Sequence, residues 1–277
     1  MGLENLAQAG KAVPAKIKVR KRTKSSIVIT CTLVTLLLLT VYTFTTFGSK
    51  EIDLAKGMTE TFANIKTMFL EPRLQHFTLA DAFIQVTVTM GLAFLTTLIG
   101  AIIALFFGLL AAENLSSGRW PAVIKGAVAF IRAVPTVLWV LIFAVSAGLG
   151  SVAAVVGMTF HTVGYLIKAY SESFEEMDNG VIEAMKASGA SWWQTVFQAV
   201  LPSSAAYIIS WTFLRFEVNF AVAVAMGAAA GAGGIGYDMF MASNFYYDLR
   251  EVGVITFFIL GFAILLELAA GRIKKMT

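Results

Sequence analysis

Long apolar runs divide this sequence, and they constrain its fold more than any other feature. Six such runs cover about residues 27–47, 83–112, 121–147, 152–167, 205–225 and 252–270. A helix of about 20 residues crosses roughly 30 Å of hydrocarbon. The chain of 277 residues is 58% hydrophobic and 14% charged, and its mean hydropathy is +0.78. These values exclude an ordinary water-soluble domain and predict an all-α integral membrane protein with six transmembrane helices.

The chain before residue 82 is predicted to have three segments. These are a basic, cytoplasmic amino-terminal tail at 1–25, a first transmembrane helix at 26–48 and an external segment at 49–81. The apolar run is longer than the core of a secretory signal and no clear cleavage site follows it, so a retained helix is favoured over a cleaved signal. Residues 82–277 are expected to form a core of five further transmembrane helices, with a part-polar cytoplasmic helix at 181–201.

Basic residues predict the orientation of these helices. With the amino terminus in the cytoplasm, fourteen of the 21 lysines and arginines lie on the cytoplasmic side. Five lie outside, namely Lys50, Lys56, Lys66, Arg73 and Arg250. This bias follows the positive-inside rule and places both termini in the cytoplasm. Because the basic residues cluster at the ends of apolar runs and form no aromatic-interleaved face, nucleic-acid binding is not expected.

Three charged residues, Arg132, Arg215 and Glu217, fall within the predicted spans. Charge is expensive in hydrocarbon, so these side chains should face the bundle interior or a water-filled cavity. One arrangement pairs Glu217 with Arg132 across two helices and leaves Arg215 to another partner, to water or to the Trp211 ring. The group is then either a structural ion pair or part of a pathway whose net positive charge suits an anion, and the sequence leaves both open.

Neighbouring residues could belong to the same pathway. His161 and Asn219 could supply hydrogen bonds there. Pro135 removes a backbone hydrogen bond close to Arg132 and should kink the third span. Gating and simple packing explain such a kink equally well.

The stretch from Glu183 to Pro202 is polar enough to leave the membrane. Its apolar residues recur every three or four positions, which predicts one amphipathic helix. Gly189 is a poor helix former in the middle of this pattern, at a cost of about 1 kcal/mol relative to alanine, so a close approach by another backbone is expected there. A helix lying flat on the membrane surface would show the same pattern.

This stretch resembles the EAA loop of the permeases of ATP-binding-cassette importers. Two substitutions depart from that loop, since Met185 replaces its third alanine and Ala199 its isoleucine. The anchor residues keep their register: Glu183, Ala184, Gly189, Leu201 and Pro202. The resemblance implies that they form a coupling helix in a groove of a cytoplasmic ATPase.

A glycine-rich segment, Gly231 to Gly236, formally matches the GxGxxG fingerprint of dinucleotide-binding proteins. That interpretation is rejected because the segment follows a membrane helix and opens no βαβ unit. A closely packed or flexible turn is the structural alternative. The segment also resembles the GAGGIG sequence of phosphonate-type and methionine-type permeases, which implies that Gly233, Gly234 and Gly236 lie beside a transport pathway.

From residue 83 onward, the motifs taken in order resemble the permease of phosphonate-type importers. They are Arg132–Pro135, His161–Leu166, the EAA-like loop, Arg215–Asn219 and the glycine segment. By this resemblance the pathway contains Arg132, Pro135, His161, Arg215, Glu217 and Asn219. One departure is Phe220-Ala221, where a basic residue commonly stands in the family, so phosphonate, phosphite and hypophosphite all remain candidate substrates.

The resemblance also implies a cellular setting and partners. It implies a type I importer permease in a bacterial inner membrane, acting as a pair that is expected to be a homodimer. Two cytoplasmic ATPases, which bind ATP with magnesium, and an external solute-binding protein would complete the importer. The chain itself has no Walker A motif, no metal-ligand cluster and no nucleophile–base pair, so no cofactor, metal or catalytic residue is expected in it. His76 and His161 are isolated in the sequence, and the single Cys31 excludes an intrachain disulfide.

Two other functions remain open. A methionine-type or other small-solute importer permease would share the EAA-like loop and the glycine segment. A self-sufficient ion-coupled carrier would use Glu217 as its coupling group and would need no ATPase. Against the carrier, the part-polar helix has no counterpart in the first half of the sequence, so no inverted repeat is detected.

Overall fold

The computed structural model describes residues 24–46 and 53–276, and these residues form helices and connecting loops without a strand. The helices in chain order are α1 (Lys24–Thr46), α2 (Leu54–Leu70), α3 (Leu79–Ala111), α4 (Trp120–Ala133), α5 (Thr136–Ala147), α6 (Ser151–Glu175), α7 (Asn179–Ala187), α8 (Trp192–Thr195), the π-helix η2 (Val196–Val200), α9 (Leu201–Ala230), α10 (Ile235–Asn244) and α11 (Leu249–Met276). The predicted all-α class is therefore confirmed. The chain divides into two compact units, residues 1–60 and 61–277.

Helix α1, in the first unit, is apolar on every side. It is long and apolar enough to cross a membrane, and none of its residues is buried. The hydroxyls of Thr30, Thr32 and Thr40 donate hydrogen bonds to carbonyls one turn earlier, at 2.8 to 2.9 Å. These bonds satisfy the polar groups within the helix itself, as a lipid-facing span requires.

The second unit holds the remaining candidate spans. Together with α1, the helices α3, α6 and α11 and the continuous helix Trp192–Ala230 are long and apolar enough to cross a membrane. The pair α4–α5 makes a sixth span when it is counted as one, although it is bent by 90°. Among the residues that the structure describes, the count is therefore five spans, or six with the bent pair, and the prediction of six agrees with the larger number.

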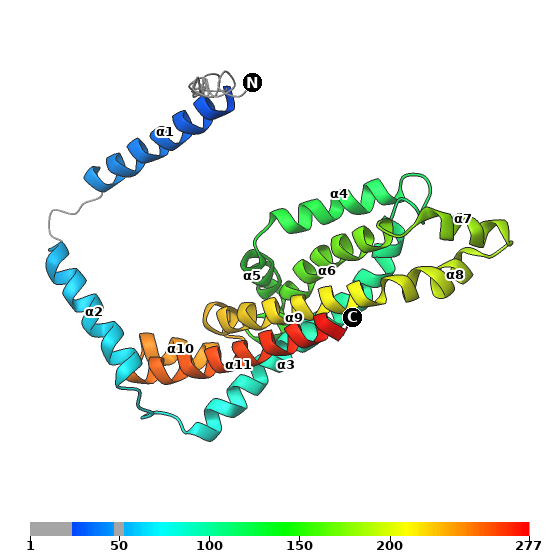
Figure 1. The fold of residues 1–277 in the computed structure, drawn as a ribbon. Helices are drawn as coiled ribbons and strands as arrows, with labels where there is room; N and C mark the ends of the chain where they lie inside the picture. Colours follow the sequence, from blue (N-terminus) through cyan, green and yellow to red (C-terminus); the bar gives the residue numbers. More distant parts are fainter. Residues whose placement is uncertain (1–23, 47–52, 277) are drawn as a thin grey trace, which may run out of the picture. The chain divides into compact units, whose positions relative to one another are not determined.

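Pro135 lies at the bend between α4 and α5, where a kink was predicted. Val134, which precedes it, has an extended backbone with φ −91° and ψ 124°. Proline disfavours the helical conformation of the preceding residue and offers no N–H to the helix, so the chain leaves one helical axis and starts another. Figure 1 shows α5 turned across the direction of α4.

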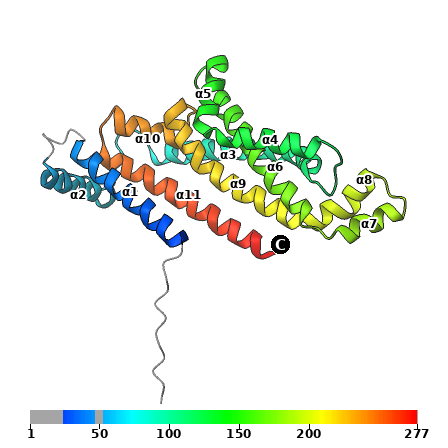
Figure 2. The ribbon, with the colours of Figure 1, turned by 90° about the horizontal axis from the view of Figure 1, so that it is seen from above.

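Helices α3, α6 and α9 pack against one another at the centre of the second unit, with α11 beside α9 (Figures 1 and 2). Their buried apolar residues form two clusters. One cluster includes Val86, Met158 and Phe220, and the other includes Ala104, Leu166 and Val200. Along α3, α6 and α9 the clusters are separated by a layer of buried polar side chains that includes Thr97, Thr162 and Arg215.

Candidate functional site

Arg215 is the charged centre of this polar layer. Only 4% of its surface is exposed. Its Nε donates a hydrogen bond to Thr162 Oγ1 at 3.3 Å, and its Nη2 lies 3.4 Å from His161 Nδ1. Among the described residues no carboxylate forms an ion pair with it. A guanidinium on a membrane-spanning helix therefore carries its positive charge without an acidic partner, an arrangement that costs several kcal/mol unless other groups stabilise it.

The Tyr165 ring supplies part of that stabilisation. Arg215 Cζ lies 5.0 Å and Arg132 Cζ lies 5.9 Å from the centre of this ring, and the Trp211 ring packs 6.2 Å away. A guanidinium over an aromatic ring contributes about 0.5–2 kcal/mol. Helices α4, α6 and α9 thus bring Arg132 and Arg215 to the Tyr165 ring. These three residues are far apart in the sequence, so the sequence alone could not show that they meet.

Asn219 ties the same layer to α3. Its Nδ2 donates to Thr97 Oγ1 at 2.8 Å and to Thr162 Oγ1 at 3.1 Å, and its Oδ1 accepts a hydrogen bond from Thr162 at 3.2 Å. All three residues are nearly inaccessible to solvent. Gly100 makes room for this contact, because a Cβ at that position would lie 2.6 Å from Thr162 Cγ2. His161 and Asn219 were predicted to lie in the pathway. Thr162 and Tyr165 fall within the His161–Leu166 motif but were given no role, and Thr97 was not predicted, because threonine and tyrosine are common in membrane helices.

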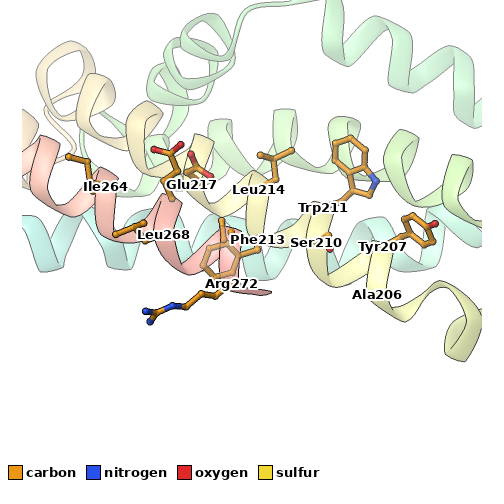
Figure 3. A pocket seen from close by; sticks show the side chains of 13 residues that line it. Ala206, Tyr207, Ser210, Trp211, Phe213, Leu214, Glu217, Ile264, Leu268 and Arg272 are labelled. Atoms are coloured by element: carbon orange, nitrogen blue, oxygen red, sulfur yellow. The ribbon is translucent and has the colours of Figure 1, made fainter. Parts of the chain in front are cut away.

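Glu217 does not belong to this cluster. The pairing of Glu217 with Arg132 considered in the sequence analysis is absent from the ion pairs of the described residues. Residues two positions apart on a helix point about 200° apart, so when Arg215 points inward Glu217 points away from the cluster. Glu217 instead lines a groove of about 1110 Å³ between α9 and α11, together with Glu267, Arg272 and apolar side chains (Figure 3).

The glycine segment forms a tight turn between α9 and α10. Gly231, Gly233 and Gly234 have φ angles of 62°, 82° and 74°, which side-chain-bearing residues rarely adopt. The backbone N–H of Ile235 donates to Thr89 Oγ1 at 3.0 Å, and a Cβ on Gly236 would overlap the Val224 carbonyl. These contacts confirm a closely packed turn. The part that Gly233, Gly234 and Gly236 play in a pathway stays a prediction.

The stretch that was predicted as one amphipathic helix is divided between α7 and a second helix that begins with α8 and continues through η2 into α9, so that prediction is wrong. The chain turns at Gly189, whose φ is 81°. The N–H of Gly189 bonds to the Lys186 carbonyl and the N–H of Ala190 to the Met185 carbonyl, both at 3.0 Å. This is a Schellman motif, in which glycine ends a helix. The expected close approach of another backbone is also wrong, because nothing lies within 4 Å of a Cβ placed on Gly189.

The two helices form a hairpin that is anchored at its base. Glu183, Ala184 and Gly189 are exposed on it. Trp192 packs against the apolar cluster that contains Leu166, and its Nε1 donates to the Leu115 carbonyl at 2.9 Å. The three exposed residues therefore lie on a projection fixed to the loop between α3 and α4.

Leu201 and Pro202 connect this hairpin to the membrane. The N–H of Leu201 bonds to the Val196 carbonyl five residues earlier, and Pro202 opens α9 with no N–H to donate. The missing donor accounts for the wider π-helical turn at this point, a feature that often marks functional segments. Residues Trp192–Ala230 run as one continuous helical segment. Because Arg215 lies on this segment, a displacement of the hairpin would also move Arg215.

A second polar cluster joins α11 to the segment between α2 and α3. Glu251 is fully buried, and its Oε1 accepts hydrogen bonds from the N–H groups of Gln75 and His76 at 2.9 and 2.7 Å. His76 Nδ1 lies 2.7 Å from Glu251 Oε2, and the His76 ring stacks on Tyr246. Asp248 brings a carboxylate oxygen within 4.8 Å of the other two ligand atoms, as a metal site would require. Because both oxygens of Glu251 already have partners, the cluster is explained by a structural role, in which it holds α11 to the segment between α2 and α3.

The histidines that are isolated in the sequence thus each have a partner in the fold. His76 pairs with Glu251, 175 positions away, and His161 lies beside Arg215. Separations of this size give no local sequence signal.

Comparison with known proteins adds a family match and several relatives. Residues 104–275 match the family described as "Binding-protein-dependent transport system inner membrane component". The chain is 32% identical over 199 residues to the phosphate-import permease protein PhnE of Mycolicibacterium smegmatis, a match that covers 70% of this chain and 36% of that protein. It is 30% identical over 190 residues to the phosphite transport system permease protein PtxC of Stutzerimonas stutzeri, covering 68% of each. This chain thus spans only about a third of the mycobacterial relative.

Solved structures support the fold. The chain superposes on the inward-facing MetNI methionine ABC transporter with a TM-score of 0.65 and 20% identity, over 72% of this chain and 99% of the other. An amino acid ABC transporter gives a TM-score of 0.58 at 15% identity, over 82% and 99%. At these identities the likeness concerns the arrangement of helices.

Proposed function

The chain belongs to the family of binding-protein-dependent transport system inner membrane components, and from this premise we propose that it carries a phosphorus oxyanion across the membrane. As an importer permease of the ATP-binding-cassette type, it has the type I importer fold and lies in the inner membrane. Phosphonate, phosphite or a related anion is the proposed substrate. Relatives named for phosphate and phosphite support this class of ligand.

The observation that carries the proposal is the positive cluster around Tyr165. Arg215 is buried without a carboxylate partner, and Arg132 lies on the same ring. Fixed cations in a site of low dielectric attract an anion more strongly than the same cations in water. The oxyanion could accept hydrogen bonds from the guanidinium N–H groups and displace their weak contacts at 3.3 and 3.4 Å.

The coupling of transport to ATP is the second part of the proposal. Glu183, Ala184 and Gly189 on the hairpin are proposed to dock into a cytoplasmic ATPase, and Leu201 and Pro202 to pass its movement to α9. ATP with magnesium would bind in that partner and drive the change between inward-facing and outward-facing states. An external solute-binding protein would deliver the anion. The permease would supply a path and fixed charge, and no covalent chemistry.

The first test of this proposal is a pull-down of the tagged protein from its native membrane in mild detergent. An ATPase subunit is expected to come down with it. The complex is then reconstituted into vesicles with its solute-binding protein, and uptake of methylphosphonate, phosphite, phosphate and methionine is compared. We expect uptake of one of the phosphorus anions and none of methionine.

Two variants sharpen the test. Arg215→Gln should lose anion uptake while the ATPase still co-purifies, because the hairpin is intact. Arg119→Gln, at the start of α4 and outside the cluster, is the matched control and should transport normally. Uptake of methionine would favour a methionine-type permease. Recovery of the protein alone, with uptake driven by protons or sodium, would instead favour a carrier.

A further inference from the structure

Helix α2 carries an exposed apolar stripe along one side. Successive residues of a helix are turned by about 100°, so Phe62, Ile65 and Phe69 share one face. Met58 continues this face by its spacing. The exposed fractions of Phe62 and Ile65 are 67% and 47%. A row of large apolar side chains with this exposure marks a surface that binds a protein or a membrane.

The other side of α2 is polar. Lys56 and Glu60 lie there as an exposed pair, with Nζ and Oε1 3.9 Å apart, and Thr67 follows on the same side. Asp53 caps the start of the helix, because its Oδ1 accepts a hydrogen bond from the Lys56 N–H at 3.1 Å. A helix with one apolar and one charged side suits the boundary between lipid and water.

Contacts with α11 hold the end of α2 in place. Arg250 Nη2 lies 2.8 Å from Glu71 Oε2, and about half of each side chain is exposed. This ion pair marks the water-facing edge of α11. A Cβ on Gly253 would overlap the Met68 carbonyl, so the backbones of the two helices are in direct contact one turn further along α11.

A third contact shows which way the stripe faces. Phe69 packs against Phe257, with ring centres 5.8 Å apart. Phe257 lies seven residues after Arg250 in the candidate span, a rise of about 10 Å along α11. The face of α2 that carries Phe62 and Ile65 is therefore turned away from the charged edge of α11 and toward the hydrocarbon.

We propose that α2 lies along the membrane surface with this stripe among the acyl chains, so that its partner is the lipid bilayer. Because α2 lies between the candidate spans α1 and α3 in the sequence, both of its ends stay close to one membrane face. In the predicted orientation this is the external face. The inference is independent of the transported substrate and of the ATPase.

The placement gives α2 a role in positioning α11. Glu71 and Met68 fix the end of α2 to Arg250 and Gly253. A helix held at the membrane surface therefore also holds the first turn of α11 at a constant depth. Interfacial anchors set the depth and tilt of membrane spans in this way.

Fluorescence quenching in vesicles tests the placement. Cys31 is replaced by serine, and a single cysteine at Phe62, Ile65, Ala63 or Asn64 is labelled with bimane. Ala63 and Asn64 are exposed and point away from the stripe on the same turn, so they are the matched controls. The protein is reconstituted into vesicles of phosphatidylethanolamine and phosphatidylglycerol. Each label is then quenched by a nitroxide high on the lipid acyl chain or by iodide on both sides of the membrane.

The lipid nitroxide should quench labels at positions 62 and 65 several-fold more than labels at 63 and 64, and iodide should show the reverse order. Iodide quenching as strong at the stripe as at the controls overturns the proposal, because the stripe would then face water. Protection of positions 62 and 65 from both quenchers also overturns it, since a protein surface would then cover the stripe. Such protection appearing only after a solute-binding protein is added would assign the stripe to that protein.

A charge placed on the stripe provides a second measurement. Phe62→Asp should lower the lipid quenching of a label at position 65 several-fold, because an ionised carboxylate is unfavourable among acyl chains. Ala63→Asp, on the other side of the helix, should leave that quenching unchanged. Both residues are exposed and lie outside the two buried clusters, so both variants should unfold at the parental temperature. Equal responses to the two substitutions contradict the placement, whereas loss of anion uptake would not affect it.

Discussion

At the residue scale, Thr162 holds the polar layer together. The Thr162 hydroxyl accepts hydrogen bonds from both Arg215 and Asn219, and it lies between the two apolar clusters. Replacing a buried hydrogen-bonding group with an apolar one of similar shape leaves its partners unsatisfied, and these partners include a charge.

Thr162→Val is accordingly expected to destabilise the protein by about 1–3 kcal/mol. Thermal unfolding in detergent measures the effect. Thr87→Val is the matched control, because the exposed Thr87 hydroxyl bonds only to the carbonyl of Phe83 one turn earlier in the same helix. Equal stability of the two variants would show that the polar layer contributes nothing to the fold.

Asp238 makes stability depend on pH. It lies on α10, outside the candidate membrane spans. Burial raises the pKa of Asp238 from 3.8 to about 6, and the negative charges of Asp81 and Glu251 add to this effect. The folded protein therefore binds more protons than the unfolded chain between about pH 4 and 6. Its stability falls as the pH rises through that window, and the full cost of ionisation is present above it.

Asp238→Asn should remove this cost. We expect the variant to be more stable than the parent at pH 7.5, by about 1 kcal/mol once solvent screening at this half-buried carboxylate is allowed for. At pH 4 the two proteins should unfold at the same temperature. A constant difference across the whole pH range would show that titration of Asp238 is not its source.

At the element scale, Gly189 defines the hairpin. Because its φ is 81° and its surroundings are open, an alanine there is strained by its backbone and not by a neighbour. Gly189→Ala should weaken co-purification of the proposed ATPase, and Gly189→Arg should abolish it, while the spans unfold at the parental temperature. Ser188→Ala, one residue earlier with an ordinary φ of −77°, is the control and should co-purify normally. Normal ATPase recovery with Gly189→Arg would contradict a coupling role.

The helices also show which features the sequence alone could predict. Apolar run lengths predicted the spans, and Pro135 predicted the bend, because hydrophobic thickness and a missing N–H act locally. The hairpin was misread as one helix, since apolar residues on two antiparallel helices can keep a helical spacing across a glycine turn.

Glu217 and Arg132 were predicted to pair because opposite charges in lipid need partners. Sequence contains no information on which helix faces separate them, whereas the fold points them to different surfaces.

At the scale of the whole molecule, residues 1–60 form a compact unit of their own, and the family match begins only at residue 104. The predicted orientation is still favoured in a chain that begins at Asp53, because four external basic residues remain, Lys56, Lys66, Arg73 and Arg250, against seven on the cytoplasmic side.

A chain that begins at Asp53 should therefore insert with α3 entering from the outside and should keep the core intact. This boundary preserves all of α2, whose end packs on α11 through Phe69 and Phe257, with ring centres 5.8 Å apart. We expect its unfolding temperature to lie within a few degrees of the parent. Labelling of a cysteine at exposed Gly189 from the cytoplasmic side checks the orientation. An inverted core would mean that α1 is needed to direct insertion. An unfolded core would mean that the chain is one cooperative unit.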